Sequence, residues 1–72
     1  MTIHDLTRFL GRTVTLRMTN REIVKIKVEF IDEDDENIVA AVIESSHPER
    51  YRSACAMRTF AAGDIVSAEV SE

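Results

Sequence analysis

The sequence predicts a mainly-β fold: a small five-stranded barrel with an N-terminal α-helix, in one domain spanning residues 1–72. Apolar residues first recur at helical spacing, and after Gly11 the period changes to strict alternation. Five short apolar segments follow that change. Strands this short would leave two exposed edges in a flat sheet, and closure into a barrel removes such edges.

The first expected element is a short helix. Thr2 is placed to act as its N-cap, and Asp5 follows at the position of a capping box. Gly11 is expected to end the helix in the left-handed conformation. One apolar face is predicted to pack on the rest of the fold, formed by Ile3, Leu6, Phe9 and Leu10.

Two alternating strands come next. The first covers residues 13–19, and Asn20 is expected to take a left-handed conformation in the turn at 19–21. The second strand shows the clearest alternation in the chain. The expected inner face of the pair consists of Val14, Leu16, Met18, Val24, Ile26, Val28 and Phe30. Lys25 and Lys27 face outward with Arg17 beside them, either as protection against aggregation or as a small phosphate patch.

The third strand, residues 38–43, is apolar at every position, which predicts either cover on both faces or a central place in the sheet. A polar loop at 45–53 precedes a fourth strand at 54–60, and a fifth runs over 64–70. The last two strands carry few charges, and such edges invite pairing with another chain. The predicted oligomer interface comprises Ala54, Ala56, Arg58, Phe60, Ile65, Val66 and Ala68.

Several functions are disfavoured by composition. The longest apolar run has six residues, whereas a membrane span needs about 20. The lone Cys55 cannot form an internal disulfide, and with no targeting pattern at the N-terminus this predicts a cytoplasmic protein. Cys55, His4 and His47 form no close ligand pair or catalytic pattern, and only two glycines are present. We therefore expect no enzymatic activity, no metal and no cofactor.

The net charge of −4 is unevenly distributed along the chain. Residues 1–31 contain six basic and three acidic side chains, whereas residues 32–44 contain six acidic and no basic ones. If this segregation persists in the fold, the acidic loop of one subunit is able to face the basic strand of another. The alternative is ordinary solubilising surface charge. The acidic net charge also disfavours nucleic-acid binding, because phosphate binding needs a positive electrostatic potential.

The order of elements and several motifs resemble the Sm-like family of small β-barrels. The motifs are Phe9-Leu10-Gly11 before Val14-x-Leu16, Phe30-Ile31-Asp32, Asn37-Ile38-Val39 and Gly63-Asp64-Ile65. A more distant resemblance is to the C-terminal barrel domain of the bacterial ribosome maturation factor, which also begins with a Phe9-Leu10-Gly11-like motif. The Sm-like resemblance implies rings in which the fourth strand of one subunit pairs with the fifth of the next.

RNA binding by Sm-like proteins depends on two loops, and both are altered here. Asp32 and Asn37 match the family's first loop, but they lie one residue further apart, and the four residues between them are acidic. Ala62 stands before Gly63, where the family has a basic residue. The resemblance therefore implies a homo-oligomeric ring that acts through protein–protein contacts, and the acidic loop disfavours RNA.

The alternative prediction is an RNA-binding Sm-like ring. Its candidate residues are Asn37, Arg50, Tyr51 and Arg52. An aromatic ring between two arginines offers a base-stacking face with cationic neighbours.

Overall fold

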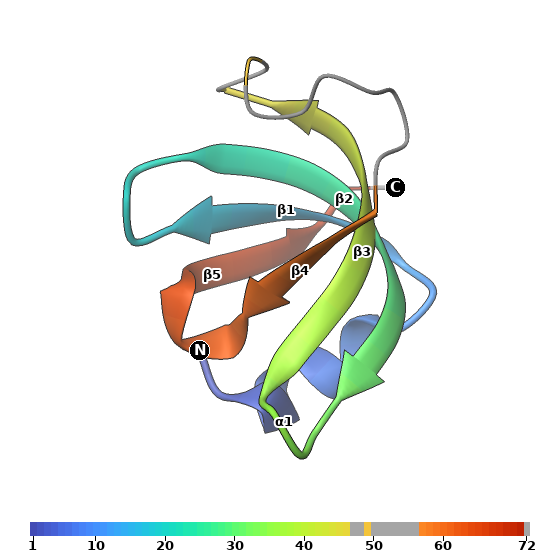
Figure 1. Ribbon diagram of the computed structural model, residues 1–72. Coiled ribbons are helices and arrows are strands. Elements are labelled where there is room, and N and C mark those ends of the chain that lie inside the picture. Colours follow the sequence, from blue (N-terminus) through green and yellow to red (C-terminus); the bar gives the residue numbers. More distant parts are fainter. Residues whose placement is uncertain (47–48, 50–56, 72) are drawn as a thin grey trace.

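The computed structural model describes residues 1–46, 49 and 57–71 (Figure 1). Its elements are α1 (Ile3–Leu6), the 3₁₀ turn η1 (Thr7–Phe9), β1 (Thr13–Met18), β2 (Ile23–Asp32), β3 (Asn37–Ser45), β4 (Met57–Ala61), the 3₁₀ turn η3 (Ala62–Asp64) and β5 (Ile65–Val70). The predicted mainly-β class, with five strands and a short N-terminal helix, is confirmed. No helix in the described ranges is long and apolar enough to cross a membrane.

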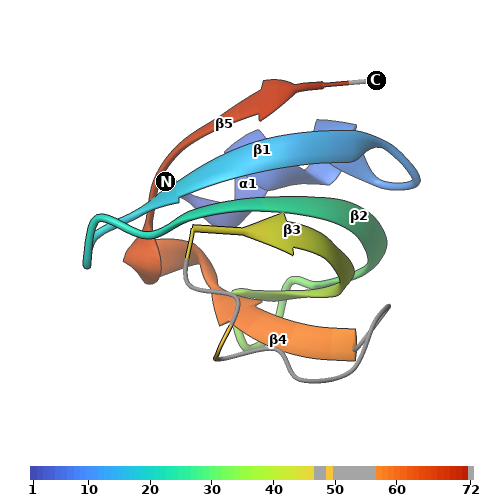
Figure 2. The same ribbon diagram turned by 90° about the horizontal axis from the view of Figure 1, so that it is seen from above.

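The five strands form one antiparallel sheet in the order β4-β3-β2-β1-β5, and Figure 2 shows them in this sequence from β5 to β4. The long strand β2 pairs with β1 over its first half and with β3 over its whole length. Its register against β3 shifts between Lys25 and Ile26 and again between Val28 and Phe30. Such bulges bend and twist a strand, so the sheet curls around its core. In the described part of the chain, β4 and β5 are the two edge strands of the sheet and do not pair with each other. The N-terminal ammonium of Met1 donates to the Ile65 carbonyl at the start of β5.

The core lies inside this curled sheet, and α1 with η1 contributes to it. Every strand adds buried apolar side chains, and the full set is Ile3, Leu6, Phe9, Val14, Leu16, Val24, Ile26, Val28, Ile38, Ala40, Val42, Phe60, Ala62 and Ile65.

The N-terminal helix begins as predicted, but α1 ends at Leu6 and a 3₁₀ turn continues it to Phe9. The Thr2 hydroxyl accepts a hydrogen bond from the Asp5 amide at 3.4 Å and donates to the Asp5 carboxylate at 3.0 Å, which confirms the cap. Leu10 was expected on the buried face, but its side chain is 54% exposed. The 3₁₀ turn stops at Phe9 and Leu10 has ψ 127°, so the helical spacing no longer applies to it.

Phe30 is a second correction. Strict alternation places it inside, yet it is 58% exposed, and Ile31 packs against the core instead. The bulge between Val28 and Phe30 inserts one extra residue in β2. Because side chains alternate with a period of two, one inserted residue exchanges the inner and outer faces beyond it.

The turn between β1 and β2 lies where it was predicted, but a different residue takes the left-handed conformation. Arg21 has φ 72°, whereas Asn20 was expected there. The Asn20 side-chain oxygen instead accepts the Glu22 amide at 2.9 Å. This local hydrogen bond is typical of Asn in turns and positions the start of β2.

β3 is internal to the sheet, between β2 and β4, which confirms the second of the two alternatives for this strand. Ile38, Ala40 and Val42 are buried, whereas Ile43 on the other face is 51% exposed. β5 begins at Ile65, one residue later than predicted, because Ala62–Asp64 form the 3₁₀ turn. β4 is described from Met57 to Ala61, and residues 54–56 of the predicted strand lie outside the described residues.

Gly11→Ala is expected to lower the free energy of unfolding by about 1–2 kcal/mol, because Gly11 has φ 77° and a Cβ there is strained. No atom lies within 4 Å of the added Cβ, so the backbone alone sets the cost. The matched control is Gly63→Ala, which has equally open space and no positive φ. It should be neutral or slightly stabilising, because alanine restricts the unfolded chain. Urea denaturation of both variants measures the difference, and equal costs would contradict this account of Gly11.

Candidate binding surfaces

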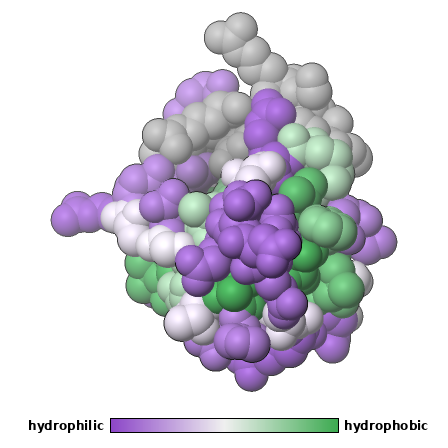
Figure 3. All heavy atoms as spheres, turned by 60° about the horizontal axis from the view of Figure 1, so that its bottom comes forward, coloured by the Kyte–Doolittle hydropathy of each residue, from purple (hydrophilic) through white to green (hydrophobic). Residues whose placement is uncertain are grey.

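The connection between β2 and β3, residues 32–36, is a tight acidic turn that we call the acidic hairpin. The Asp32 carboxylate accepts the Asp35 amide at 3.2 Å, and Glu36 takes a positive φ of 55°. The Glu36 carbonyl accepts the Ala62 amide at 2.9 Å, which ties the hairpin to the end of β4. Figure 3 brings this end of the molecule forward, with hydrophilic side chains at its centre and hydrophobic areas on both sides. Four acidic residues, 33–36, are therefore exposed beside one edge of the sheet.

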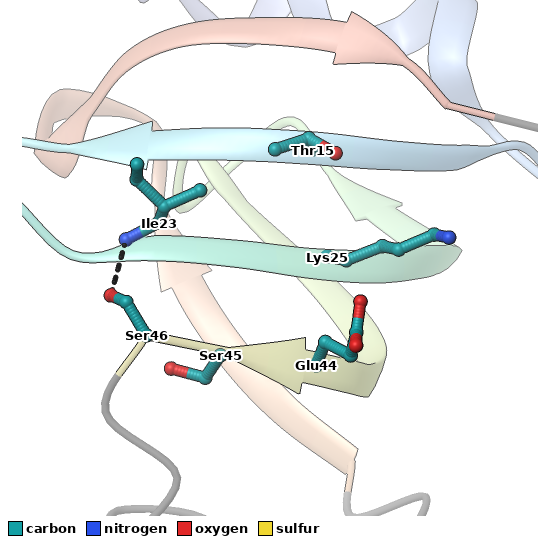
Figure 4. Close-up of a pocket in the computed structure, with 6 residues that line it drawn as sticks. All are labelled: Thr15, Ile23, Lys25, Glu44, Ser45 and Ser46. Atoms are coloured by element: carbon teal, nitrogen blue, oxygen red, sulfur yellow. Dashed lines mark hydrogen bonds between the residues drawn. The ribbon is translucent and has the colours of Figure 1, made fainter.

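A shallow groove crosses the outer face of β5, β1 and β2. We call it the basic groove and define it by its lining residues Thr15, Arg17, Arg21, Ile23, Lys25 and Ser67. Figure 4 shows the part around Ile23, whose amide donates to the Ser46 hydroxyl at 2.9 Å. Three carboxylates, Glu44, Glu69 and the buried Glu22, also line it.

The strand register explains the composition of the basic groove. Arg17 is paired with Ile23 on one side and with Ser67 on the other. Thr15 is paired with Lys25 in the next row. Paired residues of neighbouring strands share a face, so the sheet places Arg17 of β1 and Lys25 of β2 on the same face as Ile23. Ile23 is 43% exposed there.

The two charged surfaces lie at opposite ends of β2. The strand begins at Ile23 in the basic groove and ends at Asp32 in the acidic hairpin. Arg17, Arg21 and Lys25 make no ion pair with any other described residue. The acidic hairpin and these three cations therefore lie apart in the fold, whereas Glu44 of the acidic segment is paired with Lys25.

A third surface is apolar and lies on the outer side of β2, β3 and β4. It consists of Phe30, Val39, Ala41, Ile43 and Met57, which we call the apolar face. Phe30 is paired with Val39, and Ala41 with Met57, so these side chains are neighbours. Phe30, Ile43 and Met57 are each about half exposed or more.

The predicted RNA residues are only partly placed. Asn37 opens β3, is half-buried, and is paired with Asp32 and Ala61 at the base of the acidic hairpin. Arg50, Tyr51 and Arg52 lie outside the described residues. Asn37 is therefore the one of the four candidate residues that the structure places.

The predicted interface residues divide into two groups. Phe60 and Ile65 lie in the core, at 7% and 1% exposure, so at these positions the side chain faces inward. Val66 is 59% exposed, Arg58 is exposed, and Ala68 is half-buried against the core. The Arg58 guanidinium donates to the Met57 carbonyl at 3.2 Å. Ala54 and Ala56 lie outside the described residues.

The described carboxylates and histidines are not arranged around a common point. Among these residues, no group of three His, Cys, Asp or Glu side chains is placed to hold a metal ion. Glu22 is the one charged residue that the described structure buries, at 3% exposure, and the Ser45 hydroxyl donates to its carboxylate at 2.7 Å. Its position between the β1–β2 turn and the end of β3 indicates a structural contact.

Sequence reasoning missed Ile23 and Ile43 as surface residues. Ile23 precedes the alternating pattern of β2, and Ile43 continues the outer row of β3 beyond Val39 and Ala41. A signal for Ile43 is present in the sequence, since a strand that is apolar on both faces must expose one face or find a partner.

Comparison with known proteins does not identify the chain: no family model, no curated protein and no solved structure matches it.

Proposed function

We propose that this chain is a non-enzymatic assembly module with an Sm-like fold, which forms a homo-oligomeric ring through the edges of β4 and β5. The observation that supports this most directly is the open sheet. It ends on β4 and β5, and among the described residues neither outer edge has a strand partner. Unpaired edge strands are templates for pairing with another chain.

Exposed apolar side chains accompany both edges. Met57 on β4 is 48% exposed, and Val66 and Val70 on β5 are 59% and 45% exposed. A chain of 72 residues buries only about 60% of its unfolded surface, so burying these side chains between copies would add stability that the small core lacks. Because the two edges differ, the contact is head-to-tail, and such contacts close into rings when the rotation between copies allows it.

Light scattering of the purified protein tests the proposal. We expect a mass that is a multiple of the single chain at micromolar concentration. Val66→Lys should lower that mass, because a lysine on an edge strand opposes pairing. Leu10→Lys is the matched control, since Leu10 is also about half exposed but lies outside β4 and β5. A wild-type protein that stays monomeric would contradict the ring.

The RNA-binding alternative stays a prediction, because three of its four residues lie outside the described part. Fluorescence anisotropy with oligo-U and oligo-A RNA across a salt series distinguishes the two functions. The assembly module should show no tight RNA binding at about 150 mM salt, where weak phosphate contacts are screened. Tight, salt-sensitive binding that is lost when Arg50, Tyr51 and Arg52 are replaced by alanine would favour the alternative.

A further inference from the structure

We propose that the basic groove of one copy receives the acidic hairpin of the next copy, so that a charge contact sets the direction of assembly. This inference rests on the proposed ring and names the surfaces that meet in it. The occupant is a second copy of this chain, because the chain itself carries both complementary surfaces.

The acidic hairpin and the cations of the basic groove have complementary charges. The hairpin is a turn with a carboxylate at every position from Asp32 to Glu36, and residues 33–36 are exposed. The groove is lined by Arg17, Arg21 and Lys25, and these cations have no ion-pair partner among the described residues. Opposite potentials on two surfaces steer their encounter and fix their orientation.

Each surface is attached to a different edge of the sheet. The hairpin is tied to the end of β4, through the hydrogen bond between the Glu36 carbonyl and the Ala62 amide and through the pairing of Asn37 with Ala61. The groove is lined by Ser67 and Val66 at the start of β5. A contact between β4 of one copy and β5 of the next therefore involves the edges on which hairpin and groove sit.

The direction of pairing decides whether the two surfaces meet. All pairs within the sheet are antiparallel. If β4 and β5 of neighbouring copies pair in the same way, the Ala61 end of β4 lies opposite the Ile65 end of β5. The acidic hairpin of one copy is hydrogen-bonded at its Ala61 end of β4, and the basic groove of the next copy lies at its Ile65 end of β5. A parallel pairing would separate the two surfaces by the length of a strand.

Charge exchange tests the contact with the protein itself. The acid-swap variant is Glu33→Lys with Asp34→Lys and Asp35→Lys, which changes the charge of the hairpin from −5 to +1. The base-swap variant is Arg17→Glu with Lys25→Glu, which changes the summed charge of residues 17, 21 and 25 from +3 to −1. In each variant alone, hairpin and groove have the same sign, so we expect association to weaken by at least about tenfold. In an equal mixture every hairpin of one variant meets an opposite groove on the other, so assembly should return as a mixed complex.

Matched controls separate this contact from general charge effects. Glu29→Lys and Lys27→Glu change exposed charges on β2 outside both surfaces, and they should leave the mass unchanged. Far-UV circular dichroism checks that each variant is folded. Light scattering and sedimentation of the single variants and of the mixture provide the readout, together with a salt series for the wild type. Wild-type association should weaken as salt rises, because exposed charges are screened.

The outcomes distinguish the two proposals. Assembly that is lost in each swap variant and restored in the mixture supports the contact. Folded swap variants that assemble like the wild type, or fail to recover on mixing, overturn it while the ring itself stands. A wild-type protein that stays monomeric overturns both.

Discussion

Ile38→Ala is expected to lower the free energy of unfolding by about 2–5 kcal/mol. Ile38 is fully buried on the inner face of β3 and is paired with Ile31 and Phe60, so truncation leaves a cavity between three strands. A 72-residue chain has a total stability of about 4–11 kcal/mol, so this single change removes a large share of it. Urea denaturation at a concentration too low for association measures the loss.

Ile43→Ala is the matched control for Ile38→Ala. It changes the same residue type on the same strand, but Ile43 is 51% exposed on the apolar face. Its cost in the single chain should stay below about 1 kcal/mol, because little buried surface is lost. Equal costs at the two positions would mean that the inner and outer faces of β3 are wrongly placed.

Ser45→Ala is expected to lower the free energy of unfolding by about 1.5–3 kcal/mol, the range for hydrogen bonds to charged groups. The Ser45 hydroxyl donates to the Glu22 carboxylate at 2.7 Å, and Glu22 is only 3% exposed. Removing the hydroxyl deprives a buried carboxylate of a donor that water does not readily replace. Urea denaturation again provides the measurement.

Ser46→Ala serves as the control for Ser45→Ala. Ser46 is exposed, and its hydroxyl accepts the neutral Ile23 amide at 2.9 Å. An exposed neutral hydrogen bond should cost about 1 kcal/mol or less. If Ser46→Ala proves more costly than Ser45→Ala, the buried Glu22 contact does not hold β2 and β3 together at this end.

Much of the fold followed from local patterns. Alternation in β1 and in the first part of β2 places Val14, Leu16, Val24 and Ile26 inside, and all four are fully buried. Thr2 and Gly11 mark the helix start and the chain reversal because a cap and a left-handed residue act within a few residues of the chain.

The exposed faces of the sheet and its first turn depend on a strand bulge and on a side-chain hydrogen bond, which the alternation of apolar and polar residues does not encode. A bulge is decided by how two strands fit together, so Phe30 and Ile31 exchange faces without any local signal in β2. The left-handed residue of the β1–β2 turn is Arg21, because Asn20 uses its side chain to accept the Glu22 amide.

The sequence by itself determined the fold class, the inner faces of β1 and early β2, and the separation of charge along the chain, because each depends on short-range pattern or composition. Only the tertiary structure decided where those charges lie. It ties the acidic hairpin to β4 through the Glu36 carbonyl and assembles the basic groove from β1, β2 and β5. Strand register joins residues that are distant in sequence, and register is a property of the whole sheet.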